Sequence, residues 1–327
     1  MKVLLTGANG FVGSHVLDRL CAKEFPTVLV LRPAANKRFI ETHLRQVEVR
    51  IGSLSDPASL AQAMRDVTHV IHCAGCIRAL RVNEFYDVNQ LGTRAIVNAI
   101  NQQQGRVQRL VQISSMAAGG PASSDQPASE DDPPRPVSEY GKSKLAGEQE
   151  IKNGCRAPFV ILRPPSVYGP RDVEFLRLFK AVKHHLLPRI GGGRQTLSFA
   201  FVKDLAEVIV ACLDHQAVVG RTYYVSGTEV VNSRSFAEEI AAHMKTWTVP
   251  LPIPSAALWP LCCLQEAFSR LTGAANVLNR FKYPELSASG WVCNPARLRQ
   301  EAGLTCPTPL KKGLAETLSW YQEQGWV

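Results

Sequence analysis

The chain lacks several features that would assign it to another class of protein. Within its 327 residues, the longest apolar stretches, such as Phe159–Leu162 and Ala256–Leu264, are too short or too interrupted to span a bilayer. The apolar run that begins the chain meets Gly7 at once, and it is far shorter than the core of a signal peptide. We therefore expect no membrane span and no export.

Paired cysteines and clustered charge are missing as well. The nine cysteines are an odd number scattered without a paired framework, which suits a reducing cytoplasm. The 37 basic residues outnumber the 28 acidic ones, but no basic run, zinc pattern or helix-turn-helix pattern points to nucleic acid. The net charge of +9 instead favours anionic small molecules or a peripheral contact with membrane lipid.

The first two-thirds of the chain alternates short β-branched runs with helical patterns. This alternation predicts an α/β fold, a doubly wound parallel sheet of the Rossmann type. The expected strands are Lys2–Leu5, Thr27–Leu31, Val47–Ile51, His69–His72, Arg109–Ile113 and Phe159–Leu162. The expected helices are Gly13–Lys23, Leu60–Met64, Asn89–Gln104 and Val137–Lys152.

The pattern changes after Pro164, which suggests a division of the chain into two parts. We expect residues 1–165 to form a dinucleotide-binding domain and residues 166–327 to form mainly a smaller substrate-binding lobe. Further strands at Leu197–Val202 and Thr222–Val225 suggest that the chain returns to the first domain around residues 195–227. The loop Gly119–Pro136, rich in proline, serine and acidic residues, is expected to be a flexible rim over the site.

A glycine-rich turn follows the first expected strand. Its sequence is Thr6-Gly7-Ala8-Asn9-Gly10-Phe11-Val12-Gly13. Gly7 suits a tight turn, Gly10 a close approach of backbone to a pyrophosphate, and Gly13 close packing of helix on strand. A purely structural turn is the alternative, and the position after the first strand of an alternating chain favours the dinucleotide.

A tyrosine and a lysine share one face of a later expected helix. Tyr140 and Lys144 are four residues apart, and an ammonium beside a phenol favours the phenolate. The pair could therefore act as a general acid and base, although an ordinary amphipathic helix start has the same spacing. Ser114 and Ser115 end the expected strand before it, at the sheet edge where such folds bind ligands.

Taken together, these motifs resemble the extended short-chain dehydrogenase/reductase superfamily over nearly the whole chain. The glycine turn matches its T-G-x-x-G-x-x-G motif, and Tyr140-Gly141-Lys142-Ser143-Lys144 matches its Y-x-x-x-K motif. Further matches, in the order of the family, are Cys73-Ala74-Gly75, Val88-Asn89-Gln90-Leu91-Gly92-Thr93, Arg163-Pro164-Pro165-Ser166-Val167-Tyr168-Gly169-Pro170 and Phe201-Val202-Lys203-Asp204-Leu205-Ala206.

The resemblance implies a role for each matched position. Tyr140 would exchange a proton with the substrate oxygen, Lys144 would tune Tyr140 and hold the nicotinamide ribose, and Ser115, with Ser114 as its alternative, would position the carbonyl. Asn89 would support the proton relay, and hydride transfer requires no metal. The implied cofactor contacts, besides Tyr140 and Lys144, are Gly7, Asn9, Gly10, Phe11, Val12, Gly13, Arg32, Ser53, Leu54, Ala74, Gly75, Pro164 and Val167. Relatives pair the helices at Asn89–Gln104 and Val137–Lys152 across a dimer axis, which implies a homodimer.

Departures from the family are informative about the substrate. Gly119 and Gly120 replace the Tyr-Gly pair of sugar-nucleotide epimerases, and Met116 and Ala117 replace the acidic pair of 4,6-dehydratases. Leu197 and Ser198 stand where epimerases often place Arg-Asp. The run Ser114-Ser115-Met116-Ala117-Ala118-Gly119-Gly120-Pro121 is similar to the S-S-x-x-x-x-G-P of 3β-hydroxysteroid dehydrogenases, within the branch that includes dihydroflavonol reductases.

Three functions follow as hypotheses. The leading one is an NAD(P)-dependent oxidoreductase that interconverts a secondary alcohol and a ketone on an apolar substrate: a sterol, a β-keto lipid or a polyketide-like ring. A nucleotide-sugar epimerase or reductase, with diphosphate contacts from Arg171, Arg177 or Arg194, is the alternative, and a cofactor-binding subunit without catalysis is the third. The apolar set within Trp259–Leu271 is expected to be lobe core, a lid for a greasy substrate or a face on lipid.

The second expected strand predicts the cofactor. It ends in Arg32, where NAD enzymes keep an acidic residue that repels a 2′-phosphate. A guanidinium offers a planar fork to a phosphate, so we expect NADP(H) to be preferred, with NAD(H) as the alternative. Ser53 stands where relatives often keep an aspartate to hold the adenine amine.

Overall fold

The computed structural model describes residues 1–190, 193, 195–272 and 280–327. Its centre is a seven-stranded, wholly parallel sheet in the order β10-β6-β5-β4-β1-β2-β3. The strands are β1 (Val3–Thr6), β2 (Thr27–Leu31), β3 (Glu48–Ile51), β4 (His69–His72), β5 (Arg109–Ile113), β6 (Phe159–Arg163) and β10 (Arg221–Tyr224). The expected doubly wound α/β fold is confirmed.

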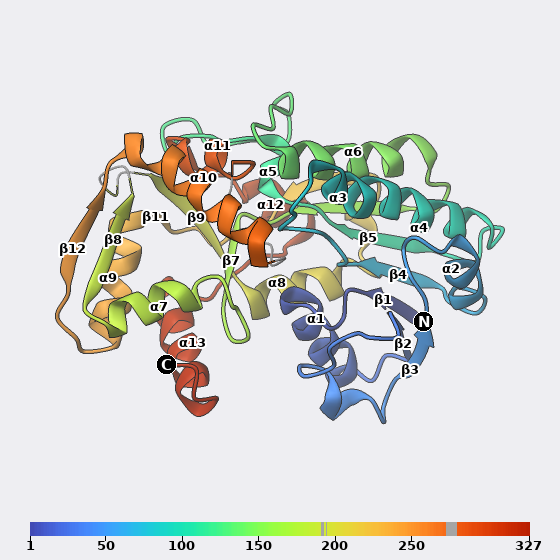
Figure 1. Ribbon diagram of the computed structural model, residues 1–327. Helices are drawn as coiled ribbons and strands as arrows, with labels where there is room; N and C mark the ends of the chain where they lie inside the picture. Colours follow the sequence, from blue (N-terminus) through green and yellow to red (C-terminus); the bar gives the residue numbers. More distant parts are fainter. Residues whose placement is uncertain (191–192, 194, 273–279) are drawn as a thin grey trace.

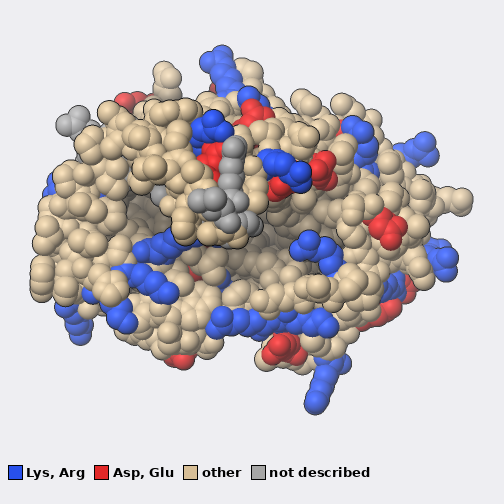
Figure 2. Space-filling model, in the orientation of Figure 1, with Lys and Arg blue, Asp and Glu red and all other residues tan. Residues whose placement is uncertain are grey.

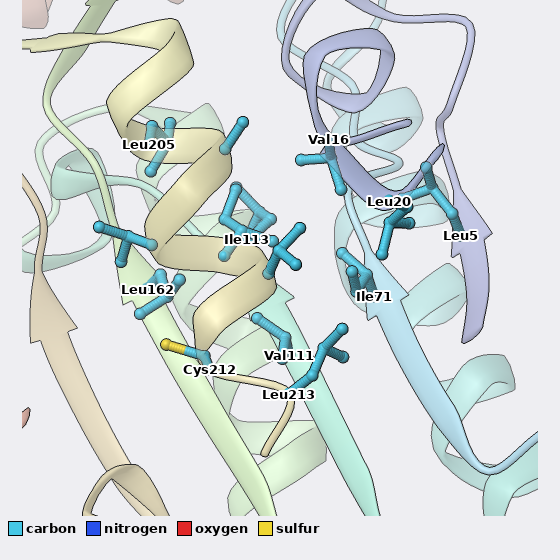
Figure 3. Packing of buried hydrophobic residues seen from close by; sticks show 14 of the residues in the cluster. Leu5, Val16, Leu20, Ile71, Val111, Ile113, Leu162, Leu205, Cys212 and Leu213 are labelled. Atoms are coloured by element: carbon cyan, nitrogen blue, oxygen red, sulfur yellow. The ribbon is translucent and has the colours of Figure 1, made fainter. Parts of the chain in front are cut away.

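Helices cover both faces of this sheet (Figure 1). On one face, α1 (Phe11–Ala22) and α8 (Val202–Ala211) pack side by side, and their side chains meet those of the strands. Figure 3 shows Val16 and Leu20 of α1 and Leu205 of α8 over Leu5, Ile71, Val111 and Leu162 of the sheet. On the other face lie α2 (Pro57–Ala63), α4 (Gly92–Asn101) and α6 (Glu139–Gly154). The central strands β1, β4 and β5 are buried along their whole length, because helices cover both faces of the sheet.

The remaining elements form a lobe with its own core. Strand β9 (Thr196–Phe201) pairs with β7 (Ser166–Tyr168), β11 (Val230–Asn232) and β13 (Gly290–Trp291), and β8 (Leu186–Ile190) pairs with β12 (Val249–Ile253). The other elements of the lobe are α7 (Leu176–Lys183), α9 (Ser233–His243), α10 (Ser255–Thr272), α11 (Tyr283–Ser287) and α13 (Leu310–Glu323). Helix α12 (Ala296–Ala302) is the exception, because it packs against β10 and its Leu298 joins the core of the large sheet. The buried core includes Tyr168, Phe179, Phe199, Phe236 and Tyr321. Within the described residues, no helix has the length and hydropathy that crossing a membrane requires.

Some elements differ from the expectation. The strand that returns to the large sheet is β10, whereas β9 belongs to the lobe. Helical structure before α4 already begins at α3 (Val82–Tyr86) and continues through a π-helical turn at Asp87–Leu91. The loop at residues 119–136, expected to be flexible, is tied to the lobe, since Ala122 pairs with Trp291 and Ala128 with Cys293.

Candidate active site

The glycine-rich turn joins β1 to α1 in a very tight space. Gly7 has a φ of +71°, and a Cβ added there would lie 2.6 Å from the backbone nitrogen of Ala74. A Cβ at Gly13 would lie 2.1 Å from the carbonyl oxygen of Gly7, so α1 could not begin where it does. The turn thus keeps a bare backbone beside a helix N-terminus, an arrangement that fits the pyrophosphate of a dinucleotide.

The other residues assigned to the cofactor lie at one edge of the sheet. Arg32 follows β2 and is exposed, Ser53 and Leu54 follow β3, and Ala74 and Gly75 follow β4. Pro164 follows β6, Val167 lies in β7, and Asn9, Phe11 and Val12 belong to the turn and the first turn of α1. Because the carboxyl ends of parallel strands share an edge, these positions gather where such folds bind ligands.

Tyr140 and Ser115 are brought together by two neighbouring helices. Ser115 is the N-cap of α5 (Met116–Gly119), and its hydroxyl accepts a hydrogen bond from the Ala117 backbone at 3.1 Å. Tyr140 lies in the first turn of α6, whose N-cap is Ser138. Burial raises the pKa of Tyr140 to about 12, and a hydrogen bond with Ser115 acts in the opposite direction. This differs from the expectation of a lowered pKa.

The surroundings of Lys144 explain part of the difference between the expected and the observed pKa of Tyr140. Its side chain is buried, and its Nζ donates to the carbonyl oxygen of Ile113, at the end of β5, over 2.7 Å. Burial lowers the pKa of Lys144 to about 8, although Glu148 and Cys73 act to raise it. Burial thus destabilises the Lys144 ammonium, which is hydrogen-bonded to a carbonyl. The pKa of Tyr140 is dominated by the desolvation of the Tyr140 phenol itself.

The structure distinguishes between the two adjacent serines. The Ser114 hydroxyl donates to the buried carboxylate of Glu148 at 2.6 Å, whereas Ser115 faces Tyr140. Glu148 also receives two hydrogen bonds from Arg163, at 2.8 and 2.7 Å, in a buried bidentate ion pair. Ser114 is therefore engaged in tying α6 to the sheet, and Ser115 is the serine available to a substrate.

Asn89 binds a loop rather than the lysine itself. It lies buried in the π-helical turn, and its amide donates to the carbonyl of Cys76 and to the Ser143 hydroxyl, both at 2.9 Å. Its oxygen accepts from the Cys76 backbone nitrogen at 2.8 Å. These bonds hold the loop after β4 against α6, and a Cβ at Gly75 would lie within 3.5 Å of both Asn89 and Lys144. Single π turns of this kind are frequent at functional sites.

Several residues around Tyr140 were missed in the sequence. Glu148 continues the four-residue spacing of Tyr140 and Lys144, a signal that could have identified it. Phe85 lies with its ring centre 6.2 Å from that of Tyr140, and the Nζ of Lys282 lies 5.1 Å from the Tyr140 ring centre. Lys282 comes from the distant lobe, and no sequence pattern connects it to the tyrosine.

A trough runs across the front of the molecule. Figure 2 shows this hollow between the region of α10 and that of α7, with basic side chains along its lower edge. Of the three arginines proposed for a diphosphate, Arg171 is ion-paired with Asp18 at 2.9 Å, Arg177 is exposed on α7, and Arg194 lies outside the described residues.

Comparison with known proteins identifies the family and the fold. The family model described as "NAD dependent epimerase/dehydratase family" matches residues 3–226. The ceramide reductase of Caulobacter vibrioides is 30% identical over 99% of this chain and 96% of its own length. The UDP-glucose 4-epimerase of Vibrio cholerae is 26% identical over 85% and 84%. The crystal structure of a UDP-glucuronic acid 4-epimerase from Bacillus cereus superimposes with a TM-score of 0.80 at 21% identity, over 99% of this chain and 100% of the other.

Proposed function

This chain belongs to the NAD-dependent epimerase/dehydratase family, and we propose that it interconverts a secondary alcohol and a ketone on an apolar, lipid-like substrate. It is an NAD-dependent enzyme of the extended short-chain dehydrogenase/reductase type. The observation that carries the proposal is the pairing of Tyr140 with Ser115 beside aromatic rings.

The chain's own residues supply the proton chemistry. The Tyr140 hydroxyl gives a proton to the substrate oxygen in reduction and takes it back in oxidation, and Ser115 hydrogen-bonds the same oxygen. Lys144 lies one helical turn from Tyr140 and carries positive charge toward the end of β5. The glycine turn would hold the pyrophosphate of a nicotinamide cofactor, and the cofactor would supply or accept the hydride when bound.

The surroundings of Tyr140 support an apolar substrate. Phe85 packs against Tyr140, and Phe281 lies with its ring centre 6.4 Å from that of Phe85. Met116 and Ala117, which follow Ser115, are buried apolar residues, so no carboxylate stands there to assist an elimination. One relative of this chain over its whole length is a ceramide reductase, an enzyme named for a lipid.

The positions that epimerases use for a diphosphate offer it little here. Ser198 is buried, and its hydroxyl accepts a hydrogen bond from the Cys293 backbone at 3.2 Å. Leu197 carries no charge, and Arg171 is engaged by Asp18. Nucleotide-sugar epimerisation remains the second candidate because an epimerase is among the relatives.

We propose NADP(H) as the preferred cofactor. Arg32 is exposed at the end of β2, beside the position of the adenosine ribose in such folds, where a guanidinium can bind a 2′-phosphate. We also propose a homodimer formed by α4 and α6, which lie side by side along one surface in Figure 1. A monomer mass by light scattering at micromolar concentration would contradict the dimer.

A ligand screen tests the substrate class. Cofactor-saturated protein is heated with keto-sphingolipids, sterols, β-keto lipids and UDP-sugars, since a ligand stabilises the state that it binds. Stabilisation by a keto-lipid, followed by its cofactor-dependent reduction, is expected. Stabilisation by UDP-sugars alone, with tightly retained NAD, would favour the epimerase.

A further inference from the structure

Part of the lobe reaches the helix that carries Tyr140. Lys282 places its Nζ 5.1 Å from the centre of the Tyr140 ring. Three residues later, the carboxylate of Glu285 accepts a hydrogen bond from the hydroxyl of Ser138, the N-cap of α6. The same hydroxyl accepts from the Gly141 backbone at 3.0 Å, so Glu285 fixes the cap that orients the first turn of α6.

Lys282 and Glu285 act on the tyrosine as a pair. They form an ion pair with each other, and Glu285 is largely buried. The backbone oxygen of Glu285 accepts from Trp291 Nε1 at 3.0 Å and from Gln195 Nε2 at 3.2 Å. The segment is thereby anchored to the strands of the lobe at the same time as it contacts the catalytic helix.

The two charges have opposite effects on the phenol. A cation over the face of an aromatic ring is attracted to its electrons, and this attraction is stronger when the ring carries the negative charge of a phenolate. A nearby carboxylate disfavours the same phenolate, and Glu285 acts in the direction of a raised Tyr140 pKa. The balance between the pair therefore adjusts how readily the phenol loses its proton, on top of the larger effect of burial.

We propose that Lys282 and Glu285 are positioning residues through which the substrate lobe controls proton transfer by Tyr140. The inference rests on the proposed role of Tyr140. The other groups that face the phenol or its helix turn are Ser115 from α5, Cys76 from the loop after β4, and Lys144 and Glu139 of α6. All four belong to the half built on the large sheet, so among the described residues Lys282 and Glu285 are the charged groups of the lobe that contact Tyr140 or its helix turn.

The chain offers a matched control for this pair. Lys142 forms an ion pair with Glu139 at 2.7 Å, also over three residues and also beside Tyr140, but on the exposed side of α6. If only the charge near Tyr140 mattered, removing Lys142 would change the pKa of Tyr140 as much as removing Lys282. If contact with the face of the ring matters, the two variants should differ in the pKa of Tyr140.

The test follows the titration of Tyr140 by NMR of protein labelled at the tyrosine ζ-carbon and saturated with oxidised cofactor. Tyr140→Phe identifies the signal. Lys282→Met is expected to move the Tyr140 titration to higher pH than in the wild type, Lys282→Arg to restore it, and Glu285→Gln to move it to lower pH. Lys142→Met is expected to leave it close to the wild-type value.

A Lys282→Met titration that coincides with that of Lys142→Met would overturn the inference. The pH profile of turnover gives the second measurement: the pH above which reduction declines should move in the same direction as the titration. Because the titration needs no substrate, a shifted Tyr140 in protein that reduces no lipid ketone would support the inference and reject the proposed substrate.

Discussion

The two halves of the molecule place their polar and apolar side chains in different ways. The half built on the large sheet holds its polar groups in closed, buried networks, such as Ser114 and Arg163 around Glu148. The lobe places apolar side chains in solvent on α10, where Leu264 is 70% exposed and Phe268 is 58% exposed. Buried networks fix geometry, whereas exposed apolar surface is available to a partner or a substrate. We infer that the first half performs the chemistry and that the lobe selects what undergoes it.

The largest loss of turnover should come from removing the hydroxyl of Tyr140. Tyr140→Phe deletes the proposed proton donor, so turnover should fall about 10²- to 10⁴-fold while cofactor affinity stays near that of the wild type. The control is Tyr86→Phe, because Tyr86 also lies near α6 but donates its hydroxyl proton to Glu139, at 3.0 Å. Near-normal turnover of Tyr140→Phe would remove Tyr140 from the mechanism.

The sequence predicts these two halves unequally. In the first, strands such as Thr27–Leu31, His69–His72 and Arg109–Ile113 agree with the structure to the residue, because burial on both faces requires a run of apolar, mostly β-branched residues at the centre of each. In the lobe, β12 contains Pro250 and Pro252, which suggest a loop, yet it pairs with β8. Such strands depend on partners distant in the chain, which no local pattern reveals.

The site shows the same division. Tyr140, Lys144 and Ser115 are recognisable from motifs because each lies in a short run of sequence within one domain, the first two in α6 and the third at the N-cap of α5. The contact of Lys282 with Tyr140 joins residues 142 positions apart (282 minus 140) and depends on how the lobe packs. The raised pKa of Tyr140 was also beyond the sequence, since burial is a property of the folded chain.

The second-largest effect tests whether the buried network around Glu148 stabilises the half of the molecule built on the large sheet. Glu148→Gln leaves the Arg163 guanidinium buried without its charge partner, so the free energy of unfolding should fall by about 3 to 5 kcal/mol. Glu150→Gln is the control on the same helix, because Glu150 pairs with the exposed Arg94 and its loss should matter much less. Urea titration of both variants measures the difference, and equal losses would contradict a special role for burial.

A third, smaller effect concerns the cofactor. Arg32→Asp replaces a cation that can bind a 2′-phosphate by a carboxylate that repels it, so NADP(H) affinity should fall at least about tenfold while NAD(H) affinity changes little. Titration of both cofactors against both proteins measures the ratio. A wild-type protein that binds NAD(H) more tightly, or a ratio that the substitution leaves unchanged, would show that Arg32 does not read the phosphate.

The smallest effect should arise in the lobe and should affect the substrate alone. Leu264→Gln removes an exposed apolar side chain, so the free energy of unfolding should change by less than about 0.5 kcal/mol. If α10 binds the apolar part of the substrate, KM for a long-chain ketone should rise about fivefold, as expected for about 1 kcal/mol of lost apolar contact. KM for a short, water-soluble ketone should not change. Leu91→Gln is the control, because Leu91 is 45% exposed on the other half of the molecule, before α4. An equal KM for the long-chain ketone in both variants would show that α10 does not contact the substrate.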